Sequence, residues 1–110
     1  FFLLSRNFQA VSQRKDRFYN RAKATGYRAR SAYKLAELDD RFHFLKPGAR
    51  ILDLGAWPGA WLQVSIERVG PSGRAVGVDL VPIDALGAPN VVTIAADVRS
   101  VETTDAIRQA

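Results

Sequence analysis

The chain has 110 residues, of which 47% are hydrophobic, and this length and composition are typical of one folded domain at most. It contains no cysteine and only one histidine, which excludes disulfide bonds, a cysteine nucleophile and a metal site built on thiolates or histidines. From this composition we expect no metal as partner. No apolar run approaches the roughly 20 residues of a membrane span, so we expect no membrane as partner either.

The net charge of +5 is unevenly distributed along the chain. Residues 1–50 carry 12 Lys+Arg and 4 Asp+Glu, whereas residues 51–110 carry 4 Lys+Arg and 7 Asp+Glu. A basic half followed by a mildly acidic half is typical of a protein that binds a polyanion at one end. We interpret residues 1–14, which hold two arginines and no acid, as a basic tail, and residues 15–110 as part of a domain.

Two helices are predicted in the basic half, over residues 16–25 and from Ser31 to about Phe42. Gly26 separates them. The second helix has an apolar stripe that is expected to pack on the later sheet, formed by Ala32, Leu35, Leu38 and Phe42. Lys34 lies near the margin of this stripe. It is either a solvated lysine whose stem covers apolar surface or an amine held at the rim of a site.

Aromatic side chains are interspersed among basic ones between residues 14 and 34. The basic ones are Arg14, Lys15, Arg17, Arg21, Lys23, Arg28, Arg30 and Lys34, and the aromatic ones are Phe18, Tyr19, Tyr27 and Tyr33. Such a cluster is often only a solvated face, but phosphates and stacked bases would be bound by the same combination. If the cluster binds nucleic acid, we predict contacts by Lys23, Arg28 and Arg30.

The stretch R-I-L-D-L-G-A-W-P-G-A-W, residues 50–61, predicts a strand, a glycine loop and a helix. The apolar residues 51–54 form the strand, the loop begins at Gly55 and turns at Pro58-Gly59, and the helix covers residues 60–69. The glycine spacing differs from the G-x-G-x-x-G pattern that binds a dinucleotide pyrophosphate. The loop therefore favours a ligand without phosphates at this position, or else it is an ordinary strand-to-helix turn.

Two further strands are predicted over residues 74–80 and 91–95, followed by a helix over residues 101–110. This order implies a parallel sheet with right-handed crossovers, whose strands end at one common edge. Asp79 and Asp97 follow the second and third of these strands, so both should lie at that edge beside the glycine loop.

A carboxylate at the end of each strand suits a nucleoside ligand. Asp79 can accept hydrogen bonds from the two hydroxyls of a ribose, and Asp97 can accept one from the amino group of an adenine. Each such charged hydrogen bond would contribute on the order of 1.5–3 kcal/mol. Alternatively, Asp79 is a solvent-facing residue and Asp97 caps the helix that follows. Asp53, inside the first strand, is expected to be structural and bonded to loop backbone.

Five blocks of the sequence, in this order and spacing, resemble the FtsJ/RrmJ family of S-adenosylmethionine-dependent RNA ribose 2′-O-methyltransferases. They are G-Y-R-A-R-S-A-Y-K-L-A-E-L, L-K-P-G, D-L-G-A-W-P-G-A-W, V-G-V-D-L-V-P-I and A-A-D-V, and the resemblance covers residues 15–99. It implies an α/β, Rossmann-like methyltransferase fold, here a half of the parallel sheet with N-terminal helices. It also implies ribosomal RNA or the ribosome as partner and a cytoplasmic location.

The resemblance also implies roles for single residues. Gly55, Gly59 and Trp61 match the loop that holds the methionine end of S-adenosylmethionine. Asp79 matches the acid that holds its ribose, and Asp97 the acid that holds its adenine. Lys34 matches the first lysine of the family's catalytic Lys-Asp-Lys-Glu tetrad.

The sequence departs from the family pattern in the loop and at its end. Trp57 and Ala60 replace an alanine and a glycine of the usual G-A-A-P-G-G-W, and Trp57 is large enough to crowd or cover the cofactor. The family's catalytic Asp, its second Lys and its Glu would lie beyond position 110. We therefore expect a truncated chain whose first strand lacks a neighbour and exposes apolar side chains.

Two alternatives to a methyltransferase remain open from the sequence. The chain is either a non-catalytic RNA-binding or regulatory module on a degenerate methyltransferase fold, or a nucleotide-dependent oxidoreductase. Only Asp79 supports the oxidoreductase, because the glycine spacing does not fit a dinucleotide.

Overall fold

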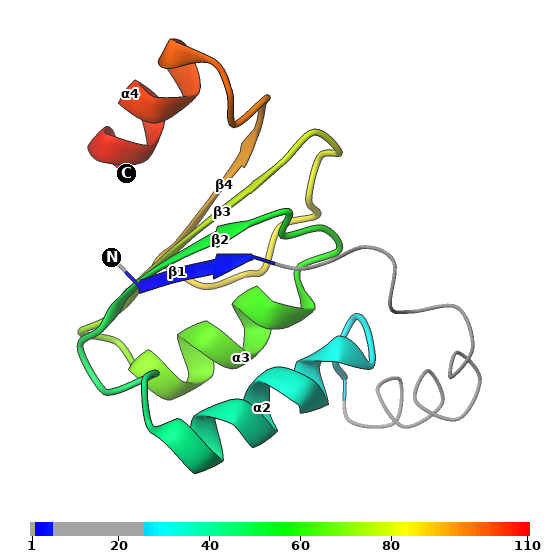
Figure 1. Cartoon of the computed structure of the whole chain (residues 1–110), viewed down its shortest axis with the longest axis vertical. Coiled ribbons are helices and arrows are strands. Elements are labelled where there is room, and N and C mark those ends of the chain that lie inside the picture. Colours follow the sequence, from blue (N-terminus) through cyan, green and yellow to red (C-terminus); the bar gives the residue numbers. More distant parts are fainter. Residues whose placement is uncertain (1, 6–25) are drawn as a thin grey trace.

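Four parallel strands form the sheet of this protein, in the order β1-β2-β3-β4 (Figure 1). The computed structural model describes residues 2–5 and 26–110. In chain order the elements are β1 (Phe2–Ser5), α2 (Ser31–Phe42), β2 (Arg50–Leu54), α3 (Ala60–Val69), β3 (Arg74–Asp79), β4 (Val91–Ala95) and α4 (Val101–Gln109). The predicted α/β fold with a parallel sheet is therefore confirmed. The helix predicted at residues 16–25 lies outside the described residues.

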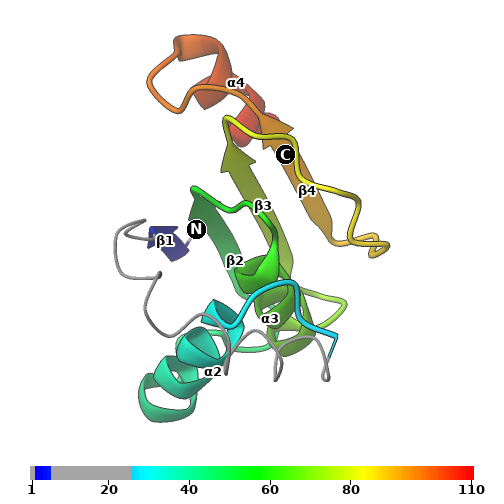
Figure 2. The same ribbon diagram turned by 90° about the vertical axis from the view of Figure 1, so that its right-hand side faces the viewer.

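Helices lie on both sides of the sheet. The helix α3 packs directly on β2 and β3, and α2 packs on α3 as a further layer on the same side (Figure 1). The helix α4 lies on the opposite side of the sheet, and it begins near the end toward which the arrowheads of β2, β3 and β4 point (Figure 2). The side chain of Arg74 donates to the carbonyl of Ala110 at 2.6 Å, which holds the end of α4 beside the start of β3.

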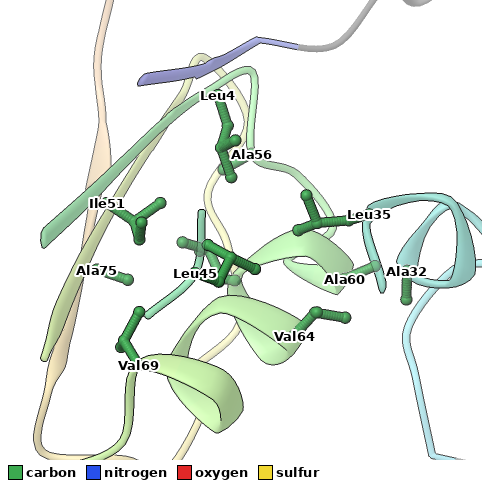
Figure 3. Packing of buried hydrophobic residues seen from close by; sticks show 11 residues of the cluster. Leu4, Ala32, Leu35, Leu45, Ile51, Ala56, Ala60, Val64, Val69 and Ala75 are labelled. Atoms are coloured by element: carbon green, nitrogen blue, oxygen red, sulfur yellow. The ribbon is translucent and has the colours of Figure 1, made fainter. Parts of the chain in front are cut away.

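The core fills the space between the sheet and α3. Side chains of the strands and of α3 point into this space, among them Ile51 and Ala75 from the sheet and Val69 from the helix, whereas Val64 points from α3 toward α2 (Figure 3). Burying a side chain of this size contributes roughly 1.5–3 kcal/mol. The approach of α3 to β3 is close at Gly77, where an added Cβ would lie 2.4 Å from Leu62 Cδ1.

The strand β1 corrects two expectations. Phe2–Ser5 were expected within a basic tail, but they pair in parallel with β2, in the register Leu3↔Leu52 and Leu4↔Asp53. The prediction that the first predicted strand lacks a neighbour on one side is therefore wrong. An unpaired strand edge offers a row of N–H and C=O groups, and a short apolar segment can satisfy them. Leu4 is only 6% exposed and joins the core, whereas Leu3 is 56% exposed.

The packing of α2 also differs from the prediction. Its buried positions are Ala32, Leu35 and Asp39, and they face α3 rather than the sheet. Phe42 is 64% exposed, although its spacing predicted a core residue. Because α3 already covers this face of the sheet, α2 packs on α3 instead of on the strands, and Phe42 does not reach the sheet. Asp39 takes the inward position because its carboxylate accepts from the backbone N–H of Leu45 at 2.7 Å.

The remaining element boundaries agree with the sequence patterns. The bounds of α2, α3 and β4 are as predicted. The strand β2 begins one residue earlier than predicted, at Arg50, β3 ends one residue earlier, at Asp79, and α4 ends at Gln109. Within residues 2–5 and 26–110, no helix has the length and apolar character needed to cross a membrane. The same part of the chain holds no group of three or more His, Cys, Asp or Glu residues suited to a metal ion.

Candidate functional site

The carboxyl ends of β2, β3 and β4 meet at one edge of the sheet, as the parallel order requires. The first residues after β2 and β4 donate backbone hydrogen bonds to the last two residues of β3. Gly55 N donates to Val78 O at 2.8 Å, and Ala96 N donates to Asp79 O at 2.9 Å. The structure therefore brings the glycine loop, Asp79 and the segment before Asp97 to the same edge, as predicted.

The glycine loop uses backbone conformations that favour glycine. Gly55 has a φ of +75° and Gly59 a φ of +108°, both in the left-handed region. Gly59 N donates to Ala56 O at 2.7 Å, which closes the turn, and Gly59 is the N-cap of α3 without a side-chain cap. The first N–H groups of α3 therefore lack a side-chain acceptor at this cap, and their partial positive charge lies next to the loop.

Asp79 connects the glycine loop to the segment that follows β3. Its Oδ2 accepts from Trp57 N at 2.9 Å, and its Oδ1 accepts from Val81 N at 3.0 Å. The residue is only 9% exposed, so it is not the solvent-facing residue that one alternative described. Each carboxylate oxygen can accept more than one hydrogen bond, and Asp79 therefore keeps acceptor capacity for ligand hydroxyls.

Asp97 is held by Arg99. The guanidinium donates from Nε to Oδ1 at 3.0 Å and from Nη2 to Oδ2 at 2.7 Å, and the backbone N–H of Arg99 donates to Oδ1 at 2.9 Å. These bonds lower the pKa of Asp97 from 3.8 to about 2, so the group is an anion at neutral pH. The helix-cap alternative is wrong, because Ser100 caps α4 by accepting from Thr103 N at 3.2 Å. A contact of Asp97 with an adenine stays a prediction.

Trp61 connects α3 to the start of α2. Its indole Nε1 donates to Ser31 O at 2.8 Å, and the ring packs against the core. This bond fixes the first turn of α2, where Lys34 lies exposed. Because the indole N–H already donates to Ser31 O, it is not available as a donor to a cofactor. The predicted contact of Trp61 with the methionine end of a cofactor stays a prediction.

The predicted nucleic-acid contacts have different surroundings. The guanidinium of Arg28 donates to three backbone carbonyls, those of Pro58, Asp84 and Ala85. Arg30 is partly buried, and its Nη1 has no hydrogen-bond partner among the described residues. Lys23 lies outside the described residues, and the contacts of all three with nucleic acid stay predictions.

Gln63, which sequence reasoning did not single out, anchors the segment before α2. Its Oε1 accepts from Arg28 N at 2.7 Å, and its Nε2 donates to Gly26 O at 3.0 Å. A polar residue within an otherwise apolar stretch of α3 was the one available signal. Asp53, expected to be structural, is fully buried in β2.

Exposed apolar side chains lie in the glycine loop and directly after each of the two carboxylates. Trp57 is 47% exposed, Leu80 directly follows Asp79 and is 73% exposed, and Val98 directly follows Asp97. Apolar side chains with this exposure are available to contact a ligand. Carboxylates for hydroxyl and amino groups, together with apolar side chains for a flat ring, are the donor set that a nucleoside needs. The residues present therefore fit a cofactor that contains adenosine.

The comparisons with known proteins agree with this geometry. Residues 27–110 match the family model "FtsJ-like methyltransferase". The ribosomal RNA large subunit methyltransferase E of Halorubrum lacusprofundi is 49% identical over 96 residues, which are 87% of this chain and 36% of that protein. The pre-rRNA 2′-O-ribose RNA methyltransferase FTSJ3 of Rattus norvegicus is 53% identical over 97 residues, 88% of this chain and 11% of that protein.

A solved structure is also similar. A crystal structure of a protein described as a ribosomal RNA methyltransferase of Plasmodium falciparum superposes with a TM-score of 0.61 at 40% identity. The match covers 69% of this chain and 41% of that one. The chain thus spans little more than a third of the Halorubrum relative and a smaller share of the rat relative.

Proposed function

Because this chain belongs to the FtsJ-like methyltransferase family, we propose that it is the cofactor-binding part of an RNA 2′-O-methyltransferase. The reaction transfers a methyl group from S-adenosylmethionine to a ribose 2′-hydroxyl of ribosomal RNA, and we expect it to take place in the cytoplasm. The observation that carries the proposal is the position of Asp79. Its carboxylate lies at the end of β3, bonded to backbone N–H groups of both neighbouring loops.

The proposed cofactor contacts divide among three segments. Asp79 accepts from the ribose hydroxyls, Asp97 accepts from the adenine amino group, and the loop from Gly55 to Gly59 lies along the methionine end. S-adenosylmethionine supplies an electrophilic methyl group on a positively charged sulfur. This chain provides the fixed carboxylates and the loop that orient that methyl group, and orientation of this kind accounts for a large part of a transfer rate.

The RNA side of the reaction is proposed for the basic half of the chain. Lys34 helps to deprotonate or orient the 2′-hydroxyl, and its place in the first turn of α2 is fixed by the bond between Trp61 and Ser31. The basic segment that includes Lys23 and Arg30 holds RNA phosphates. Binding of this kind releases counterions, so RNA affinity is expected to fall as salt rises.

The direct test joins this chain to the segment of an FtsJ-like relative that carries the other three tetrad residues. Methyl transfer by this fusion to unmodified ribosomal RNA is then measured with S-adenosylmethionine labelled in its methyl group. A 2′-O-methyl group blocks alkaline cleavage of the adjacent phosphodiester, so the label is expected in alkali-resistant dinucleotides. Lys34→Ala should abolish transfer while S-adenosylmethionine still binds. The control Lys46→Ala removes the same charge from an exposed lysine in a turn and should transfer normally.

Two results would contradict the proposal. If the protein does not bind S-adenosylmethionine, the assignment of this cofactor is wrong. RNA binding together with cofactor binding, but without transfer, would instead support the non-catalytic RNA-binding module.

A further inference from the structure

The guanidinium of Arg28 connects two loops that lie far apart in the sequence. Its Nη1 donates to Pro58 O at 3.0 Å and to Asp84 O at 2.7 Å, and its Nη2 donates to Ala85 O at 2.7 Å. The acceptors are 30, 56 and 57 residues away along the chain. We call this arrangement the Arg28 bridge.

The backbone around Arg28 is itself anchored on α3, so the position of the guanidinium is determined. Arg28 N donates to Gln63 Oε1, and Gln63 Nε2 donates to Gly26 O. One turn further along α3, Glu67 Oε2 accepts from the Tyr27 hydroxyl at 3.0 Å. Residues 26–28 are therefore fixed to the helix that begins at the glycine loop.

Gly59 shows how closely Arg28 approaches the loop. A Cβ added at this residue would lie 3.0 Å from Arg28 Nη1 and 3.3 Å from Ile83 Cγ2, both closer than ordinary van der Waals contact. The absence of a side chain at Gly59 thus makes room for the bridge and for the loop after β3. The family resemblance implied, in addition, that Gly59 lies along the methionine end of the cofactor.

The two bridged loops are also the two that Asp79 holds. Asp79 accepts from Trp57 N in the first loop and from Val81 N in the second. Two separate ties therefore set the distance between the loops, one at the end of β3 and one through Arg28. The ion pairs of the described residues involve Arg68 and Arg99, so the Arg28 bridge rests on carbonyl acceptors alone.

We propose that Arg28 is a positioning residue that holds the loops of residues 57–60 and 81–85 at the separation needed to bind S-adenosylmethionine. The inference rests on the proposed function for the identity of the cofactor. A lysine carries its N–H donors on one tetrahedral nitrogen. It cannot reproduce the planar fork in which Nη1 reaches Pro58 O and Asp84 O while Nη2 reaches Ala85 O, so Lys in place of Arg28 is not conservative here.

The test compares Arg28→Ala and Arg28→Lys with Arg41→Ala in the full chain. Arg41 is an exposed arginine at the end of α2, where its guanidinium lies over the ring of Phe42, away from both loops. Calorimetry measures the Kd for S-adenosylmethionine, and hydrogen exchange without cofactor measures the opening of each loop. Both Arg28 variants should raise the Kd for S-adenosylmethionine about tenfold or more, which is the equivalent of one to two lost hydrogen bonds.

The exchange pattern separates positioning from general stability. The amides of residues 57, 59, 60, 81 and 83–85 should exchange at least about tenfold faster in both Arg28 variants, while amides of β2 and β3 keep their protection. Added ethylguanidinium should partly restore the cofactor affinity of Arg28→Ala, which loss of overall stability would not permit. Arg41→Ala should leave the affinity and the exchange of both loops unchanged.

Four results would overturn the inference. They are wild-type cofactor affinity in Arg28→Lys, unchanged loop exchange, faster exchange throughout the protein, and loss of RNA affinity with unchanged cofactor affinity. The last would make Arg28 an RNA contact instead. If the unaltered protein binds S-adenosylmethionine but transfers no methyl group, the proposed function fails while the Arg28 measurements still decide the bridge.

Discussion

Replacement of Asp79 by asparagine tests the site most directly. The asparagine side chain would keep one oxygen acceptor, but its amide nitrogen would face the other backbone N–H, that of either Trp57 or Val81. One charged hydrogen bond is then lost, at a cost of about 1.5–3 kcal/mol. Because 1 kcal/mol shifts the Tm of a domain of this size by roughly 4–8 °C, we expect the Tm of Asp79→Asn to fall by about 10 °C.

The same substitution should weaken S-adenosylmethionine binding. Removing the charged acceptor for the ribose hydroxyls is expected to raise the Kd about 10- to 150-fold. Circular dichroism melts and calorimetric titrations would be run on the unaltered chain, on Asp79→Asn and Asp79→Ala, and on Asp105→Asn. Asp105 is exposed on α4, so its variant removes the same charge far from the loops and should resemble the unaltered chain.

The two measurements refute different parts of the reasoning. An unchanged Tm in both Asp79 variants would show that the bonds to Trp57 N and Val81 N do not hold the loops. An unchanged Kd with a lowered Tm would leave the structural role of Asp79 and remove its assignment to the ribose.

Three other parts of the molecule can be tested in the same way. Gly59→Ala should lower the free energy of unfolding by about 1–2 kcal/mol in urea titrations, because its φ of +108° is strained for any residue with a Cβ; unchanged stability would contradict the observed φ. Leu4→Ala should cost about 2 kcal/mol by the same method and Leu3→Ala much less, since only Leu4 is buried; equal effects would contradict the pairing of β1 with β2. The depressed pKa of Asp97 means that its pairing with Arg99 stabilises the fold above the unfolded value near 3.8 and is lost as pH falls through about 2. Arg99→Ala should raise that pKa toward 3.8 in an NMR titration of the carboxyl carbon, and a pKa that stays depressed would show that Arg99 is not its cause.

Local patterns were sufficient to predict most of the elements. The bounds of α2, α3 and β4 follow from hydrophobic periodicity between glycine and proline turns, which acts over a few residues. The alternation of strands and helices also predicts a parallel sheet, and a parallel sheet places Asp79 and the glycine loop at one edge. That part of the site could be inferred because strands that pair in parallel through crossover connections place their carboxyl ends at one edge.

Contacts between distant residues were decided only by the tertiary structure. The four residues of β1 carry no turn or periodic signal, and their strand forms because the edge of β2 is available. The side chain of Arg28 looked like one basic residue among many, yet it bonds to carbonyls 30 to 57 residues away. The inward place of Asp39 likewise depends on its bond to Leu45 N, which begins the turn after α2. Hydrogen-bond partners of this kind are selected by the three-dimensional packing of helices and loops, which no short stretch of sequence encodes by itself.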